Sequence, residues 1–252
     1  MKDRNENWNA MPYSKKNLQP DTILEGLNSN FILLLPYFAP YIVYVGIAAL
    51  FRGLSPEWSY SLKIVTVTAV LIWAWHRYIP FTGPKSTFIS VTWGVLCGLV
   101  GTVIWIFLLR PFVDMETNAW SKSAYFLRLM AASILVPIFE ELLMRGYIFR
   151  LAYQWGEQRK KDKGKAFDRA LNDQSINNFK PGAWSTSALL VSTIAFTLGH
   201  QIQEWPAAFL YGILMVFLWI TRKDLISCIV AHGTTNFALG LYVYFTNQWE
   251  LW

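Results

Sequence analysis

Two long apolar stretches without any charged residue constrain the fold of this chain more than any other feature. Residues Phe31–Phe51 and Thr87–Leu109 contain no Asp, Glu, Lys or Arg. Each is about as long as the roughly 20 residues that a helix needs to cross the hydrocarbon core of a bilayer. The whole chain is 54% hydrophobic and 15% charged, well below the roughly 25% charged residues of soluble domains. The sequence therefore predicts an all-α protein, a polytopic transmembrane helix bundle.

Five further apolar segments bring the predicted number of spans to about seven. The weakest spans only if Lys63 and Arg77 at its ends extend outward to the membrane surface. A polar stretch from Gln154 to Lys180 mixes acidic and basic residues, and we expect it to be a solvated loop. The five segments are Ile64–Trp75, Ala124–Tyr153, Ala183–Gly199, Trp205–Ile220 and Leu225–Gln248.

The distribution of Lys and Arg between these segments predicts their orientation. Fifteen lie in the N-terminal tail and in every second connection, and four lie in the opposite set. Because basic residues are retained on the cytoplasmic side, this asymmetry places the N-terminus in the cytoplasm and the C-terminus outside. We expect a cytoplasmic tail over residues 1–30 and a transmembrane domain over 31–252. The predicted location is a cell membrane, most simply a bacterial inner membrane, with the lipid bilayer and no nucleic acid as partner.

One apolar segment carries two adjacent acids, in the stretch VPIFEELLMRGYIFR that starts at Val136. A charge near the bilayer centre costs about 2.5–3.5 kcal/mol on insertion scales. Glu141 and Arg145 are four residues apart on one helix face, with the acid first, which is the better order for an ion pair. Glu140 points about 100° away, and a structural salt bridge does not account for it. Pro137 deprives the Ser133 carbonyl of its helical donor and favours a kink beside the acids.

Two histidines and an asparagine share the predicted membrane domain with these acids. His200 follows Phe196 by four residues, so the two rings lie on one helix face. His232 and Asn236 are also four residues apart. A single histidine in an apolar helix is more often a hydrogen-bonded core residue than a catalyst. The combination on three separate helices, each member of which is costly in a membrane, favours a functional site.

These residues resemble the motifs of a known family. Glu140–Arg145 matches EExxxR, Phe196–His200 matches FxxxH, and His232–Asn236 matches HxxxN. In this order they are similar to the motifs of the CAAX-protease and bacteriocin-processing (CPBP or Abi) family of intramembrane glutamic endopeptidases, over residues 124–252. The Trp-rich C-terminal sequence is also similar to a bacterial branch described as CAAX prenyl protease-related, which is found alongside exosortase sorting systems.

The resemblance implies a metal-independent hydrolase without a cofactor, whose substrate is a membrane-associated protein or peptide, lipidated or not. Glu140 as general base and His200 would hold the water that attacks the scissile carbonyl. His232 and Asn236 would donate hydrogen bonds to the oxyanion, and Glu141, Arg145 and Phe196 would support them. For one water to serve Glu140 and His200, helices whose sequence positions suggest different depths must converge on a water-filled cavity. We expect tilting or a kink at Pro137, with His232 and Asn236 across that cavity from Glu140.

Two other functions are compatible with the same residues. A zinc-dependent membrane peptidase could use Glu140, His200 and His232, because two histidines and a carboxylate form a common catalytic zinc site. However, the chain has no HExxH motif. The other alternative is a non-catalytic membrane scaffold or protein-sorting factor of the same fold, which would have little need of the complete set of polar residues.

Overall fold

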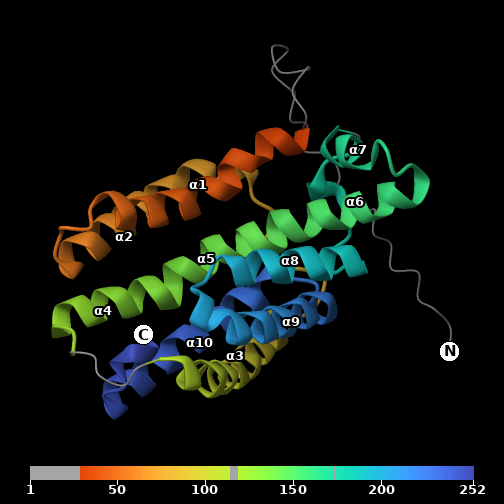
Figure 1. Ribbon diagram of the computed structural model, residues 1–252. Helices are drawn as coiled ribbons and strands as arrows, with labels where there is room; N and C mark the ends of the chain where they lie inside the picture. The colour runs from red at the N-terminus through yellow and green to blue at the C-terminus, as the bar shows by residue number, and fades with distance from the viewer. Residues whose placement is uncertain (1–28, 114–118, 173) are drawn as a thin grey trace.

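The computed structural model describes residues 29–113, 119–172 and 174–252, and all regular structure in these ranges is helical (Figure 1). The all-α prediction is therefore confirmed, whereas the predicted tail lies almost entirely outside the described residues. The described α-helices are α1 (Ser29–Leu50), α2 (Pro56–Ala74), α3 (Thr87–Leu109), α4 (Lys122–Met130), α5 (Val136–Glu141), α6 (Phe149–Lys161), α7 (Ala166–Asn172), α8 (Thr186–Leu198), α9 (Trp205–Arg222) and α10 (Leu225–Thr246).

Five of the described helices are long and apolar enough to cross a membrane. They are α1, α2, α3, α9 and α10. A short 3₁₀ helix extends α2, α3 and α9. Their outward faces are apolar, as on α3, where Phe88 is 81% exposed and Phe107 is 76% exposed. Two of the seven predicted spans are not among the five: α8 has only 13 residues, and the segment with the acids is charged and interrupted. Large exposed apolar faces of this kind are typical of helices that contact lipid.

The acid-bearing segment forms one long helical rod through the molecule, in the order α4, α5 and α6 (Figure 1). Two wider π-helical turns, Ala131–Leu135 and Leu142–Ile148, join these helices. In the first, the Val136 N–H donates to the Ala131 carbonyl five residues back. The next bond in that register would need an N–H at position 137, which proline lacks. The carbonyl left over is therefore that of Ala132, rather than that of Ser133 as the α-helical register predicts.

Helices α3 and α10 pack closely because small residues face each other. A methyl group added to Gly98 would lie 2.6 Å from the Ala231 carbonyl oxygen. Gly94 lies four residues earlier on the same face of α3, where an added methyl group would lie 2.8 Å from the Ser227 carbonyl oxygen. Such a spacing lets helix backbones approach in a membrane. The close contact of α3 with Ser227 and Ala231 sets the rotation of α10 about its axis, and so the direction in which the next residue, His232, points.

The polar stretch after α6 is more ordered than the sequence suggests. Helix α6 continues to Lys161 and α7 follows within the range predicted as a solvated loop, so that prediction is wrong for these residues. Buried Asn30 at the start of α1 donates to Gln154 Oε1 at 3.2 Å and to the Ala170 carbonyl at 2.7 Å. Its side-chain oxygen accepts from the Ile176 N–H at 2.8 Å. These bonds attach the stretch to the helix bundle.

The prediction for Lys63 is also wrong. Helix α2 begins at Pro56, eight residues before the predicted Ile64, so Lys63 lies within the helix rather than at its end. Its side chain turns inward and the residue is only 6% exposed. The ammonium lies 4.8 Å from the centre of the Tyr44 ring and 4.5 Å from that of the Tyr60 ring. Two aromatic faces inside the bundle thus replace the membrane surface as the environment of this cation.

Candidate active site

The long rod carries both acids, and they face different surroundings. Glu141 is fully buried, and its Oε2 lies 3.2 Å from a nitrogen of the equally buried Arg145. Arg145 also donates to the Gly212 carbonyl on α9 at 3.3 Å and lies over the Phe196 ring at 5.4 Å. Glu140 is the less buried acid, with 15% of its side chain exposed. The predicted ion pair is confirmed, and Glu140 is directed toward a cavity.

His232 on α10 lies between the two acids. Its Nδ1 is 2.9 Å from Glu141 Oε1, and its Nε2 is 3.8 Å from Glu140 Oε2. An ionised carboxylate only accepts hydrogen bonds, so Nδ1 carries a proton. From the sequence we expected His232 across the cavity from Glu140. Instead, it lies beside Glu140.

His200 lies just beyond the end of α8, half-buried, with its ring against Phe196 at 4.6 Å between ring centres. Its Nδ1 is 2.8 Å from the Phe196 carbonyl oxygen. Because a carbonyl only accepts, Nδ1 is again the protonated nitrogen, and Nε2 of the neutral ring is an acceptor. The Trp105 ring packs edge-on against His200 at 5.3 Å. The imidazole is thus held with its accepting nitrogen available.

Asn236, one turn after His232, connects α10 to the rod. Its Nδ2 donates to the Ala132 carbonyl at 2.7 Å. This is the carbonyl that the π-helical turn and Pro137 leave without a backbone donor. The amide has two N–H groups, so one of them can still serve a ligand. The asparagine therefore has a structural role and a free donor at the same time.

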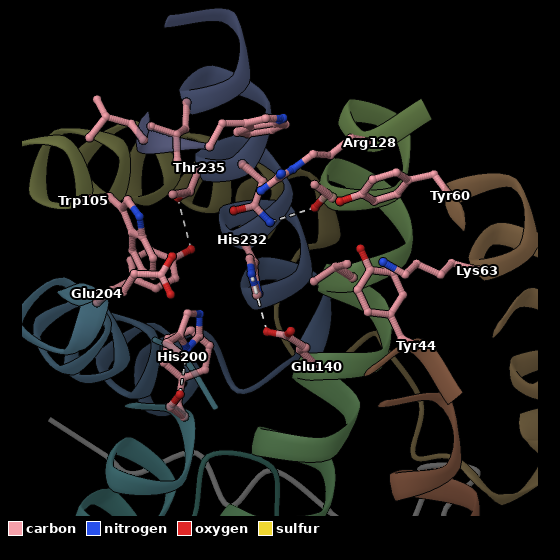
Figure 2. Close-up of a pocket in the computed structure, with 18 residues that line it drawn as sticks. Tyr44, Tyr60, Lys63, Trp105, Arg128, Glu140, His200, Glu204, His232 and Thr235 are labelled. Atoms are coloured by element: carbon pink, nitrogen blue, oxygen red, sulfur yellow. Dashed lines mark hydrogen bonds and ion pairs between the residues drawn. The ribbon is translucent and has the colours of Figure 1, made fainter. Parts of the chain in front are cut away.

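The four polar motif residues line one cavity of about 280 Å³ (Figure 2). Glu140, His232 and His200 come from three elements that lie far apart in the sequence. Figure 2 shows Glu140 and His232 together in the middle of the cavity, with His200 on a neighbouring wall. Its remaining lining residues are mainly aromatic or charged; they include Tyr44, Tyr60, Lys63, Trp105, Arg128, Glu204, Tyr211, Thr235 and Trp252. The expected convergence of the motifs on a cavity is confirmed.

Sequence reasoning missed several of these lining residues. Thr235 lies inside the HxxxN motif, and its hydroxyl contacts the Gly98 carbonyl at 2.8 Å and the buried Tyr211 hydroxyl at 3.1 Å. Lys63 and Arg128 carried a usable signal, because each is a charge in an otherwise apolar segment. Tyr211 carried none, since an aromatic residue in an apolar helix is unremarkable in sequence.

The arrangement offers the parts that hydrolysis requires. Glu140 and the accepting Nε2 of His200 face the same space, where a water molecule can be held and deprotonated. His232 and Asn236 line the same cavity, where they can offer hydrogen-bond donors to a developing negative charge. Among residues 29–113, 119–172 and 174–252, no three His, Cys, Asp or Glu side chains are grouped closely enough to hold a metal ion.

Comparison with known proteins gives a family match. Residues 122–238, slightly less than half of the chain, match the family described as "Type II CAAX prenyl endopeptidase Rce1-like". The range contains all three motifs. No curated protein and no solved structure matches the chain.

Proposed function

We propose that this chain is an intramembrane glutamic endopeptidase, because residues 122–238 match the Rce1-like type II CAAX prenyl endopeptidase family, which is a family of proteases. Its substrate would be a membrane-associated protein or peptide. The observation that carries the proposal is the cavity shared by Glu140, His200, His232 and Asn236. A scaffold protein would have little need to gather four polar side chains, each of them costly in a membrane, around one cavity.

In the proposed reaction, Glu140 takes a proton from a water molecule that His200 Nε2 helps to hold. The oxygen of this water bonds to the scissile carbonyl carbon, and the carbonyl oxygen becomes an oxyanion. His232 Nε2–H and the second N–H of Asn236 would donate to that oxyanion. The C–N bond then breaks as Glu140 returns the proton to the leaving nitrogen, giving one new carboxyl group and one new amine.

Glu141 and Arg145 would act through His232. Glu141 accepts from His232 Nδ1 at 2.9 Å and is neutralised by Arg145. A carboxylate on the far side of an imidazole fixes the ring orientation and stabilises its protonated form. In this proposal, Glu141 positions the donor, and the buried ion pair holds Glu141 itself.

We propose seven membrane crossings with a cytoplasmic N-terminus. Two contacts support this by joining helix ends that the topology places on the same side of the membrane. Asn30 contacts Gln154 at one end of the bundle, and Glu57 contacts Ser121 and Ser123 at the other. The basic connections belong to the first end, whereas Tyr60, Glu204 and Trp252 bring the cavity toward the second. The cavity would then open on the non-cytoplasmic side. Labelling of single cysteines at exposed positions 54 and 180 with a membrane-impermeant reagent in whole cells tests this: only position 54 should react.

The decisive experiment for the function is a cleavage screen with the purified protein and lipidated and unlipidated peptides. Wild type should cleave at least one peptide, and Glu140→Gln should not, while remaining folded. Glu204→Gln is the matched control, because this cavity acid accepts from the Gln201 N–H at 2.8 Å within its own turn. Equal turnover by Glu140→Gln and wild type would contradict the mechanism. Binding without cleavage by any variant would favour a scaffold or sorting factor.

Membership of the exosortase-associated branch stays a prediction that rests on the Trp-rich C-terminal sequence.

A further inference from the structure

The cavity has a second charged region that the proposed reaction does not use. At the opposite end from His200, Lys63 on α2 and Arg128 on α4 line the wall (Figure 2). We call these two residues the cationic end. Lys63 is 6% exposed and points between the Tyr44 and Tyr60 rings. Arg128 lies 4.8 Å from the Trp120 ring and 5.0 Å from the Trp252 ring.

Lys63 is buried and Arg128 is half-buried, and both differ from the buried Arg145 and Arg222, which have partners inside the protein. Within the described ranges, no ion pair involves Lys63 or Arg128. By contrast, Arg145 is paired with Glu141, and Arg222 donates to Ser90 at 2.9 Å. Cation–π contacts recover less than a buried ammonium loses on leaving water. Two like charges on the wall of one cavity also repel each other. The cationic end is therefore incomplete without an anion.

The shape and lining of the cavity indicate which anion would fit. At about 280 Å³, it is at the small end of ligand pockets, which measure roughly 300–1,000 Å³. It can take a short piece of peptide next to Glu140, but no folded domain. Its aromatic wall suits apolar side chains, and the two cations suit a carboxylate beyond them. Lys and Arg both form strong charge-assisted hydrogen bonds with carboxylates.

We infer that Lys63 and Arg128 form a carboxylate-binding subsite, which selects peptides that carry a carboxylate a few residues from the scissile bond. The inference rests on the proposed function for the peptide nature of the ligand. The carboxylate has two possible sources, the free C-terminus of the peptide or an acidic side chain. Because the cations and Glu140 line one cavity, binding this carboxylate also positions the scissile carbonyl.

The test compares peptides that differ only in this charge. The probes are an apolar hexapeptide with a free C-terminus, its C-terminal amide, and amidated hexapeptides with Asp or Asn at successive positions. Binding is measured on full-length Glu140→Gln protein in detergent, so that cleavage does not interfere. At least one carboxylate peptide should bind about tenfold or more tightly than its uncharged counterpart. A preference for the free C-terminus over the amide identifies the first source, and a preference for Asp over Asn the second.

The variants Lys63→Met and Arg128→Met, made in the same background, should each bring this affinity ratio close to one. Methionine keeps the apolar stem of either side chain, and Lys63→Arg should restore part of the preference. Lys122→Met, an exposed lysine at the same end of the bundle, is the control and should leave the ratio unchanged. The ratio of the two peptide affinities is measured on the same preparation of one variant, so a general loss of folded protein does not change it.

The outcomes for the subsite and for the function are separable. Equal binding of charged and uncharged peptides, or no peptide binding at all, overturns the subsite. So does a charge preference that persists in both methionine variants. If wild type cleaves charged and uncharged peptides equally well, the endopeptidase stands and the subsite fails. If no peptide is cleaved but the charge preference depends on Lys63, the subsite stands and the endopeptidase fails.

Discussion

Two polar clusters contact α10, one at its N-terminal end and one near its middle, and they differ in whether their hydrogen bonds and charges are complete. The first, which we call the closed cluster, consists of Ser90, Arg222 and Asp224. Ser90 donates to Asp224 at 2.5 Å and accepts from Arg222 at 2.9 Å. Asp224 also caps α10 by accepting from the Ser227 N–H at 2.9 Å. Each charged group in this cluster is matched inside the protein.

The second cluster surrounds the cavity and is open. Among the described residues, the ion pair of Glu140 is with His232 at 3.8 Å. His200 keeps one accepting nitrogen, and the cationic end has no ion-pair partner in the same ranges. Polar groups in a membrane are costly unless they are satisfied. A cluster that is complete within the chain stabilises the fold, whereas one that is completed only by water and substrate indicates chemistry. The predictions below test this distinction, from the largest expected effect to the smallest.

The largest effect is expected for Glu141→Gln, because Glu141 contacts both the buried Arg145 and the cavity residue His232. The substitution leaves buried Arg145 without its counter-charge, which should lower the free energy of unfolding by about 3–5 kcal/mol. It also weakens the acceptor of His232, so turnover by the remaining folded protein should fall at least about a hundredfold. Thermal unfolding and peptide cleavage on the same preparation measure both.

The control for this variant is Glu157→Gln on the same rod. Glu157 pairs with Lys160 on the surface, where 38% and 69% of the two side chains are exposed, and such pairs contribute little. Wild-type stability in Glu141→Gln would mean that Arg145 is balanced by another group, and the division into closed and open clusters would lose its clearest member.

A smaller combined effect is expected for Asn236→Ala. Turnover should fall about 10²–10³-fold if Asn236 donates to the oxyanion. The free energy of unfolding should fall by about 1–3 kcal/mol, because the Ala132 carbonyl loses its donor. Asn236→Asp keeps the shape but removes both N–H groups, so it should be as inactive as the alanine variant. Thr246→Ala on the same helix is the control, and active Asn236→Asp would exclude a donor role.

The sequence was informative where one property dominated a segment. The bounds of α3 were predicted correctly because no charge interrupts Thr87–Leu109. Lys63 was misplaced because a charge at a predicted helix end and a charge facing a cavity look alike in sequence. Only the packing of the Tyr44 and Tyr60 rings distinguishes them.

The candidate site was predictable in its members but not in its arrangement. The motif spacing identified Glu140, His200, His232 and Asn236, and the cavity contains all four. The position of His232 between both acids depends on the close approach of α10 to the rod, where an added methyl group on Gly233 would lie 2.5 Å from the Ser133 carbonyl oxygen. No spacing within one helix encodes a contact between two helices.

A moderate effect confined to stability is expected for Asp224→Asn in the closed cluster. The asparagine amide can still cap α10, but the negative charge is lost. That charge is the acceptor for Ser90, which in turn accepts from Arg222. The free energy of unfolding should fall by about 1–3 kcal/mol, and turnover by the folded protein should match wild type. Thermal unfolding and cleavage assays check this. A large loss of turnover without loss of stability would show that the closed cluster also takes part in the reaction.

The smallest effect is expected from metal chelators, and it tests the open cluster most directly. A zinc ligand histidine commonly donates its other ring N–H to a carboxylate, as His232 does to Glu141, so this geometry alone does not separate acid–base from zinc chemistry. A catalytic zinc site needs three protein ligands about 2.0–2.2 Å from the metal, and the described residues contain no such group of three. We therefore expect EDTA and phenanthroline to leave turnover unchanged, and the purified active protein to contain no stoichiometric zinc. If chelation stops cleavage and added zinc restores it, the anion that completes the open cluster would be a metal-bound hydroxide, and Glu140 would be a ligand instead of the base.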